Sequence, residues 1–251
     1  MTKLYQKSEI SFAVLWIVVY VFLTSIADRL SDAVGVMKSV TAALHIVMSL
    51  ILFFWIRYNH LGQKFGFCRS EVAAKRFLYY LPLVIIASTA LWGGITMQYG
   101  FPETVLYIVS MCCVGFLEEV IFRGLLFRAM EKDNLKSAIL VSALTFGIGH
   151  IVNLFNGSGR DLTSTLIQIT FAVLVGFVLV LIFYHGKSLV PCILFHSANN
   201  ALKVFAAEGI LSPQAEMFMN IVVIVVVLGG YLFYLVKAFP IKEKAHAETP
   251  S

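Results

Sequence analysis

Eight apolar segments recur along the chain, each close to the roughly 20 residues that an α-helix needs to cross a bilayer. Only 13% of the residues are charged, 59% are hydrophobic and the mean hydropathy is +0.87. Soluble domains have about 25% charged residues, so this composition excludes a soluble fold, a disordered chain and a disulfide scaffold. The sequence predicts an all-α, polytopic membrane bundle of about eight transmembrane helices. The predicted spans are 10–27, 33–56, 77–98, 104–127, 137–155, 162–184, 188–206 and 214–238.

The basic residues lie mostly in alternate connections between these spans. With a cytoplasmic N-terminus, 14 of the 19 Lys and Arg residues fall in cytoplasmic segments, three in outer segments and two within spans. This bias follows the positive-inside rule and predicts that both termini are cytoplasmic. Because the net charge of +5 is spread between membrane segments, we expect a multi-pass protein of the cell membrane, surrounded by lipid bilayer, with no nucleic-acid partner.

The chain is predicted to form a single transmembrane domain over residues 1–251. Its longest polar connection, 57–76, is basic and partly amphipathic, and we expect it on the cytoplasmic membrane surface. A flexible tail is predicted from about residue 242. In the second span, Lys38 and His45 have no evident partners in the sequence, and Lys38 can extend to the membrane interface.

The fourth span carries two adjacent carboxylates and an arginine within an apolar sequence. An ionised group at the bilayer centre costs about 2.5–3.5 kcal/mol even on insertion-based scales. Glu119 and Arg123 are four residues apart, so they share a helix face and are predicted to form a supporting ion pair. Glu118 lies about 100° around the helix and has no local partner, which makes it the candidate for chemistry.

Two later spans each place a histidine four residues from an aromatic or polar residue. Phe146 and His150 share a face in the fifth span, among small residues that allow close helix packing, and His196 and Asn200 share a face in the seventh. Each histidine taken alone could be only an interhelical hydrogen-bond donor. One converging site is more economical than three separate buried polar groups, so we expect Glu118, His150 and His196 to meet.

These residues suit hydrolysis of a peptide bond without a covalent intermediate. Glu118 with His150 could deprotonate a water, and His196 with Asn200 could donate hydrogen bonds to the oxyanion. No serine lies in a GxSxG elbow and no cysteine has an evident base, which disfavours a covalent nucleophile. No cofactor is expected, although zinc bound by Glu118, His150 and His196 is chemically possible without an HExxH motif.

The predicted topology also sets the depth of these groups. Glu118 falls in the cytoplasmic half of its span, His150 in the outer half of its span and His196 near the middle. At a rise of about 1.5 Å per residue, Glu118 and His150 are therefore expected to differ in depth.

The order and spacing of three motifs resemble the CPBP intramembrane proteases, the CAAX proteases and bacteriocin-processing enzymes also called the Abi family. The resemblance covers roughly residues 77–206. The motifs are Glu118-Glu119-x-x-x-Arg123-Gly124, Phe146-x-x-x-His150 and His196-x-x-x-Asn200.

The resemblance implies a helical bundle with a membrane-buried cavity open to the cytosol. It implies a glutamic endopeptidase, with a metallopeptidase as the alternative, that cleaves a membrane-associated peptide or protein. The compact chain and short loops fit a bacterial plasma-membrane member, for which a bacteriocin or pheromone precursor is a suitable substrate. The implied catalytic residues are Glu118, His150, His196 and Asn200, with Glu119, Arg123 and Phe146 in supporting positions.

Two other classes of function stay open at this point. In a proton-coupled membrane transporter, Glu118 and the two histidines would carry protons, but the spacing of His196 and Asn200 would have no explanation. A non-catalytic scaffold, acting in bacteriocin immunity or regulation, would keep full activity in cells after Glu118→Ala.

Overall fold

The computed structural model describes residues 1–154, 162–207 and 210–241. Within them the chain is helical, with one isolated bridge between Ile95 and Ala206, so the all-α prediction is confirmed. The tail predicted from about residue 242 lies outside the described residues. The helical elements are α1 (Thr2–Lys7), α2 (Glu9–Val34), α3 (Ser39–Tyr58), η1 (Phe77–Tyr79), α4 (Leu81–Ser88), η2 (Thr89–Leu91), α5 (Phe101–Glu119), η3 (Val120–Phe127), α6 (Arg128–Met130), α7 (Leu135–Ile148), η4 (Gly149–Leu154), α8 (Leu162–Gly186), α9 (Val190–Ala201), η5 (Leu202–Phe205), α10 (Pro213–Val222), η6 (Val223–Gly229) and α11 (Gly230–Ala238).

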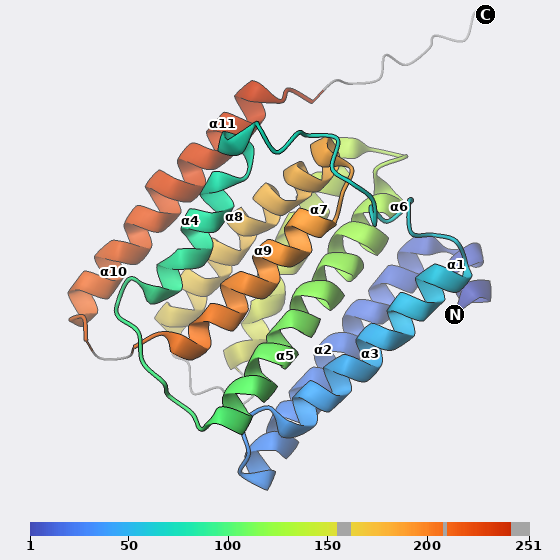
Figure 1. The fold of residues 1–251 in the computed structure, drawn as a ribbon. Helices are drawn as coiled ribbons and strands as arrows, with labels where there is room; N and C mark the ends of the chain where they lie inside the picture. Colours follow the sequence, from blue (N-terminus) through green and yellow to red (C-terminus); the bar gives the residue numbers. More distant parts are fainter. Residues whose placement is uncertain (155–161, 208–209, 242–251) are drawn as a thin grey trace, which may run out of the picture.

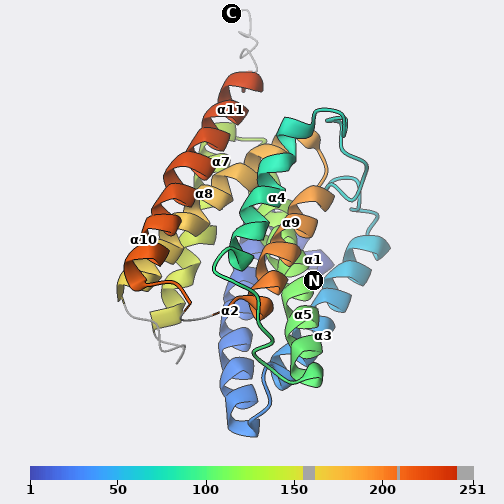
Figure 2. The same ribbon diagram turned by 60° about the vertical axis from the view of Figure 1, so that its left-hand side comes forward.

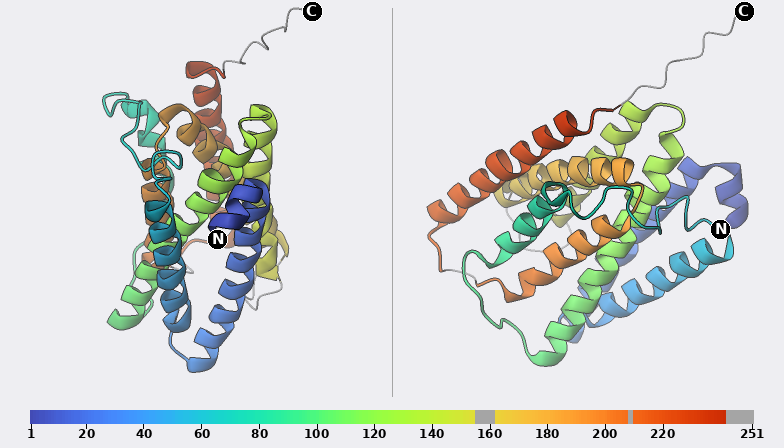
Figure 3. Two further views of the ribbon diagram at one scale, coloured as in Figure 1. Left: turned by 90° about the vertical axis from the view of Figure 1, so that its right-hand side faces the viewer. Right: turned by 45° about the horizontal axis from the view of Figure 1, so that its top comes forward.

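The helices form a bundle in which the N-terminal hairpin and the C-terminal helix lie at opposite edges. The hairpin of α2 and α3 forms one edge, and the α10–α11 helix forms the other (Figures 1 and 2). Between them, α5 packs against α3 and α9, and α7 packs against α8. The turn between α2 and α3 lies at the same end of the bundle as the start of α5 (Figure 3), where the Met37 amide donates to Glu103 at 3.1 Å.

Six helical stretches are long and apolar enough to cross a membrane by length and composition, as in a multi-pass membrane protein. The other two predicted spans contain only shorter helices. Residues 77–98 include the apolar helix Leu81–Leu91, and residues 188–206 include α9 and η5. The count of eight spans and the cytoplasmic location of the termini stay predictions. The six stretches are Glu9–Val34, Ser39–Tyr58, Phe101–Met130, Leu135–Leu154, Leu162–Gly186 and Gln214–Ala238.

The first long helix extends beyond its predicted end at residue 27 because Asp28 has partners inside the bundle. Lys38 donates to Asp28 at 2.7 Å and Thr41 donates to the same oxygen at 2.6 Å. The expectation that Lys38 lacks a partner is therefore wrong. The helix ends at Gly35, whose φ of +75° belongs to the left-handed region that glycine adopts without strain.

Small residues bring the central helices into close contact. A Cβ added to Gly115 of α5 would lie 2.6 Å from the backbone nitrogen of Ser197 in α9, and one added to Gly147 of α7 would lie 2.6 Å from that of Val173 in α8. Such close approach is typical of helix packing in membranes. It sets α5 against α9 and α7 against α8, which fixes the spacing of the helices that carry Glu118, His196 and His150.

We predict that Gly115→Ala destabilises the protein by about 1–3 kcal/mol, because the added methyl group overlaps backbone atoms that cannot move independently. Thermal unfolding of the purified protein in detergent would measure the loss. Gly230→Ala is the matched control, since no atom lies within 4 Å of its added Cβ. Equal melting temperatures for the two variants would contradict the close packing of α5 on α9.

Candidate active site

The two carboxylates predicted from the fourth span lie at the end of α5, where the helix changes type. Glu118 and Glu119 are its last two residues, and the π-helical segment η3 begins immediately after them. π-helical turns within long helices are rare and occur often at functional sites. Arg123 lies in η3, and its Nη1 donates to Glu119 Oε1 at 3.1 Å. Both side chains are fully buried, so the structure contains the ion pair expected from their spacing.

Arg123 is held by contacts to two further helices. Its guanidinium lies 4.2 Å from the ring centroid of Phe146 in α7. Its Nη2 atom lies 3.4 Å from the carbonyl oxygen of Gly176 in α8, at the long end of hydrogen-bond distance. Arg123 therefore neutralises Glu119 and also joins η3 to α7 and α8.

Glu119 also binds His196. His196 Nδ1 donates to Glu119 Oε1 at 2.8 Å, to the same oxygen that accepts from Arg123. The histidine lies in α9, is buried, and meets the ring of Phe146 edge to face at 5.5 Å. Because a carboxylate only accepts hydrogen bonds, Nδ1 carries the proton and Nε2 is the nitrogen that faces Glu118.

Glu118 contacts His196 from the other side. Its Oε2 lies 3.5 Å from His196 Nε2, so the imidazole is placed between two carboxylates from α5. Glu118 Oε1 accepts a hydrogen bond of 2.7 Å from the Tyr20 hydroxyl. Glu118 thus has two neighbours from distant parts of the chain, and the sequence analysis missed Tyr20. Its signal was weak: a tyrosine within an apolar span, whose hydroxyl needs a partner when buried.

His150 lies just beyond the end of α7, in the 3₁₀ segment η4. Its Nδ1 lies 3.2 Å from the backbone oxygen of Phe146, and the two rings meet at 5.7 Å. Among the described residues no hydrogen bond joins His150 to Glu118, although the two are close enough to interact electrostatically. The structure therefore brings Glu118 and His196 into contact and leaves His150 nearby without a hydrogen bond to Glu118.

Asn200 follows His196 by one turn on α9 and is partly exposed. Its side-chain oxygen accepts from Asn199 at 3.4 Å and from Lys203 at 3.3 Å, both at the long end of hydrogen-bond distance. The amide group therefore lies on the same helix as His196 and is only weakly held. The catalytic roles of these residues stay predictions.

Within the described part of the chain, no three His, Cys, Asp or Glu side chains form a group that could hold a metal ion. The proposed zinc ligands Glu118, His150 and His196 are therefore not gathered into a metal-binding set. The Nδ1 atom of His196 is taken by Glu119 and that of His150 faces a carbonyl oxygen. We derive no step of the reaction through a metal.

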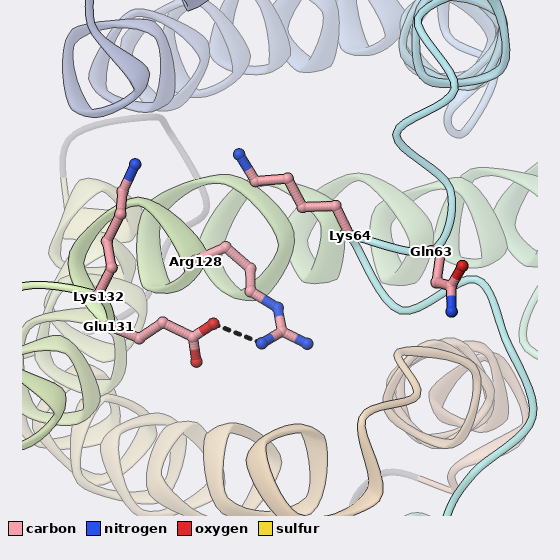
Figure 4. A pocket seen from close by; sticks show the side chains of 5 residues that line it. All are labelled: Gln63, Lys64, Arg128, Glu131 and Lys132. Carbon is pink, nitrogen blue, oxygen red and sulfur yellow. Dashed lines mark hydrogen bonds and ion pairs between the residues drawn. The ribbon is translucent and has the colours of Figure 1, made fainter. Parts of the chain in front are cut away.

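A cavity of about 340 Å³ lies away from these residues, near α6. It is lined by Gln63, Lys64, Arg128, Glu131 and Lys132, and Arg128 pairs with Glu131 across it at 2.5 Å (Figure 4). Lys64 also donates to Glu9 at 2.7 Å. Burial lowers the pKa of Lys64, but its hydrogen bonds to Glu9 and Tyr5 outweigh that effect and raise the pKa.

Residues 100–202 match the model of the family described as Type II CAAX prenyl endopeptidase Rce1-like. Over these residues the chain is similar to that family. The match spans less than half of the chain and lies inside the predicted core of 77–206. No curated protein and no solved structure matches. The family match does not favour the transporter or the non-catalytic scaffold.

We predict that Arg123→Ala lowers stability by about 3–5 kcal/mol, because it leaves Glu119 buried without its cation. The melting temperature and the folded yield in detergent would both fall. Arg57→Ala, at an exposed position near the end of α3, is the control and should change neither. A normal melting temperature for Arg123→Ala would show that the Glu119–Arg123 ion pair does not stabilise the fold.

Proposed function

We propose that the protein is an intramembrane endopeptidase that hydrolyses peptide bonds of membrane-associated peptides or proteins. The observation that carries this proposal is Glu118, a carboxylate within the residues that match the CAAX endopeptidase family, which faces His196 and accepts a hydrogen bond from Tyr20. Arg123 neutralises the adjacent Glu119, and its other contacts are with Phe146 and Gly176. A carboxylate is costly to keep in an apolar bundle, which suits Glu118 to a chemical role.

Glu118 and His150 are proposed to activate the attacking water. The bond of His150 Nδ1 to a carbonyl oxygen requires a proton on Nδ1, which leaves Nε2 of the neutral ring as an acceptor. A water that donates to Glu118 and to His150 Nε2 would be placed to attack a carbonyl carbon. One water proton moves to Glu118 as the C–O bond forms. When the C–N bond breaks, Glu118 returns that proton to the departing amine.

His196 and Asn200 are proposed to stabilise the oxyanion of the tetrahedral intermediate. With Nδ1 bound to Glu119, a doubly protonated His196 can donate from Nε2 towards the reacting carbonyl oxygen. Asn200 lies one turn further on the same face of α9, and its amide can supply a second donor. Donors fixed in place before the reaction stabilise developing charge most effectively, and Glu119 with Arg123 provides that fixed setting for His196.

The substrate class follows from the location of the site and from the family match. Glu118 and His196 lie within the helical bundle of a multi-pass membrane protein, which favours a membrane-associated substrate. The family description names CAAX prenyl endopeptidases, which makes a prenylated peptide ending in a CAAX sequence one class to test. An unlipidated bacteriocin or pheromone precursor is the other class to test. The reaction is proposed to need no metal or other cofactor.

We predict that Glu118→Gln lowers the rate of cleavage by about 10²–10⁴-fold, because the amide cannot accept the proton from water. The purified protein would be given quenched-fluorescence peptides, lipidated and unlipidated, in detergent. Wild type stripped of metal should keep its activity, and Glu118→Gln should stay folded. Glu216→Gln is the matched control, since Glu216 is exposed on α10.

The outcomes of this experiment separate the mechanisms. Full turnover by Glu118→Gln would remove Glu118 from the reaction. Loss of activity on metal stripping, with recovery on adding zinc, would overturn the metal-free mechanism. Cleavage of no peptide by wild type would contradict the peptidase proposal, and proton flux in proteoliposomes would then test the transporter.

A further inference from the structure

We propose that Tyr20, on the N-terminal helix α2, is a positioning residue that orients the Glu118 carboxylate for its reaction with water. The inference rests on the proposed function of Glu118. Tyr20 lies outside residues 100–202, the segment that matches the CAAX protease family. Its side chain is 6% exposed, and its hydroxyl donates to Glu118 Oε1 at 2.7 Å.

The Tyr20 bond distinguishes the two oxygens of Glu118. Oε1 is bound by the phenol, while Oε2 points to His196 Nε2 at 3.5 Å. A glutamate side chain has three rotatable bonds, and the hydrogen bond to one oxygen favours the arrangement in which that bond is made. The oxygen that remains on the His196 side is then the one that can accept a proton from water. A general base contributes to rate only when it is held within reach of that proton.

Tyr20 is itself held by a buried histidine that the mechanism does not use. The ring of His45, on α3, lies 5.9 Å from the ring of Tyr20. His45 is 1% exposed and has polar partners on both α2 and α5. Its Nε2 lies 3.1 Å from the Thr24 hydroxyl on α2, and its Nδ1 lies 3.0 Å from the Ser110 hydroxyl on α5. His45 therefore has the partners that the sequence did not suggest.

These bonds fix α2 relative to α5 close to the Tyr20–Glu118 contact. Thr24 follows Tyr20 by four residues on α2, and Ser110 precedes Glu118 by eight residues on α5. At about 100° per residue, Thr24 lies about 40° around α2 from Tyr20, and Ser110 lies about 80° around α5 from Glu118 and roughly two turns before it. The polar contacts of His45 thus join α2 to α5 within about two turns of the Tyr20–Glu118 bond, and they help to hold the two helices in the register that this bond needs.

The test is Tyr20→Phe, which removes the hydroxyl and keeps the ring. We expect kcat to fall at least about tenfold with KM unchanged, because the substrate still binds while the base is less well placed. Tyr79→Phe is the matched control: Tyr79 is also buried, and its hydroxyl donates to the Ile182 carbonyl at 2.8 Å, away from Glu118. Both variants lose one buried hydrogen bond, so both melting temperatures should fall slightly, but only Tyr20→Phe should lose kcat.

A second kinetic comparison separates positioning from a general structural effect. Glu118→Asp shortens the side chain by one methylene and withdraws the carboxylate from the phenol. If Tyr20 acts through Glu118, Tyr20→Phe should lower kcat much less in the Glu118→Asp protein than in wild type. An equal loss in both backgrounds would show that Tyr20 acts elsewhere and would overturn the proposal.

Infrared spectroscopy gives a readout that does not depend on peptide cleavage. The band of the Glu118 carboxyl group is identified by its loss in Glu118→Gln, and we expect it to shift in Tyr20→Phe and to stay in place in Tyr79→Phe. An unchanged band, or an unchanged kcat in an active enzyme, would overturn the role of Tyr20. If wild type cleaves no peptide, the peptidase proposal fails, and the band alone still decides whether Tyr20 orients Glu118.

Discussion

One oxygen of Glu119 accepts hydrogen bonds from both Arg123 and His196, and the arrangement of the central helices depends on this shared acceptor. A carboxylate, a guanidinium and an imidazole could not be buried separately without a large desolvation cost. Glu119 and Arg123 neutralise each other's charge, and His196 is hydrogen-bonded to Glu119. Each of these contacts joins the segments that carry the two side chains. The guanidinium also contacts α7 through Phe146 and α8 through Gly176. The contacts of Glu119, Arg123 and His196 therefore hold α5, α7, α8 and α9 together beside Glu118.

Glu118 and Glu119 are adjacent in the chain, so the Glu119–Arg123 ion pair lies directly beside the carboxylate that is proposed to react. Glu118 and Glu119 differ by about 100° around the helix, so one carboxylate faces Arg123 while the next faces Tyr20. His196 lies between them and contacts both. The structural carboxylate fixes the ring through Nδ1, which leaves Nε2 on the side of Glu118. The orientation of His196 is thus set by Glu119, without any contribution from a substrate.

The features that sequence reasoning predicted are those that depend on local spacing. The Glu119–Arg123 pair follows from an interval of four residues, and the long helices follow from apolar length. The contact of Tyr20 with Glu118 joins positions 98 residues apart, and neither spacing nor composition indicates it. A membrane helix is apolar on every face, so hydrophobic periodicity does not reveal which face meets a neighbour. The π-helical segment η3, which places Arg123, has no signal of its own in the sequence.

The same reasoning explains why the proposed site extends beyond residues 100–202, which match the family model. Glu118 Oε2 lies near His196, which is also within residues 100–202. Glu118 Oε1 accepts a hydrogen bond from the Tyr20 hydroxyl on α2, outside that range. That helix is itself fixed to α5 through His45, whose two ring nitrogens contact Thr24 and Ser110. Buried polar groups in an apolar bundle are stable only when they are paired, so each of these side chains requires the next. The N-terminal hairpin is therefore part of the proposed active site, because it supplies the contact that gives Glu118 a single orientation.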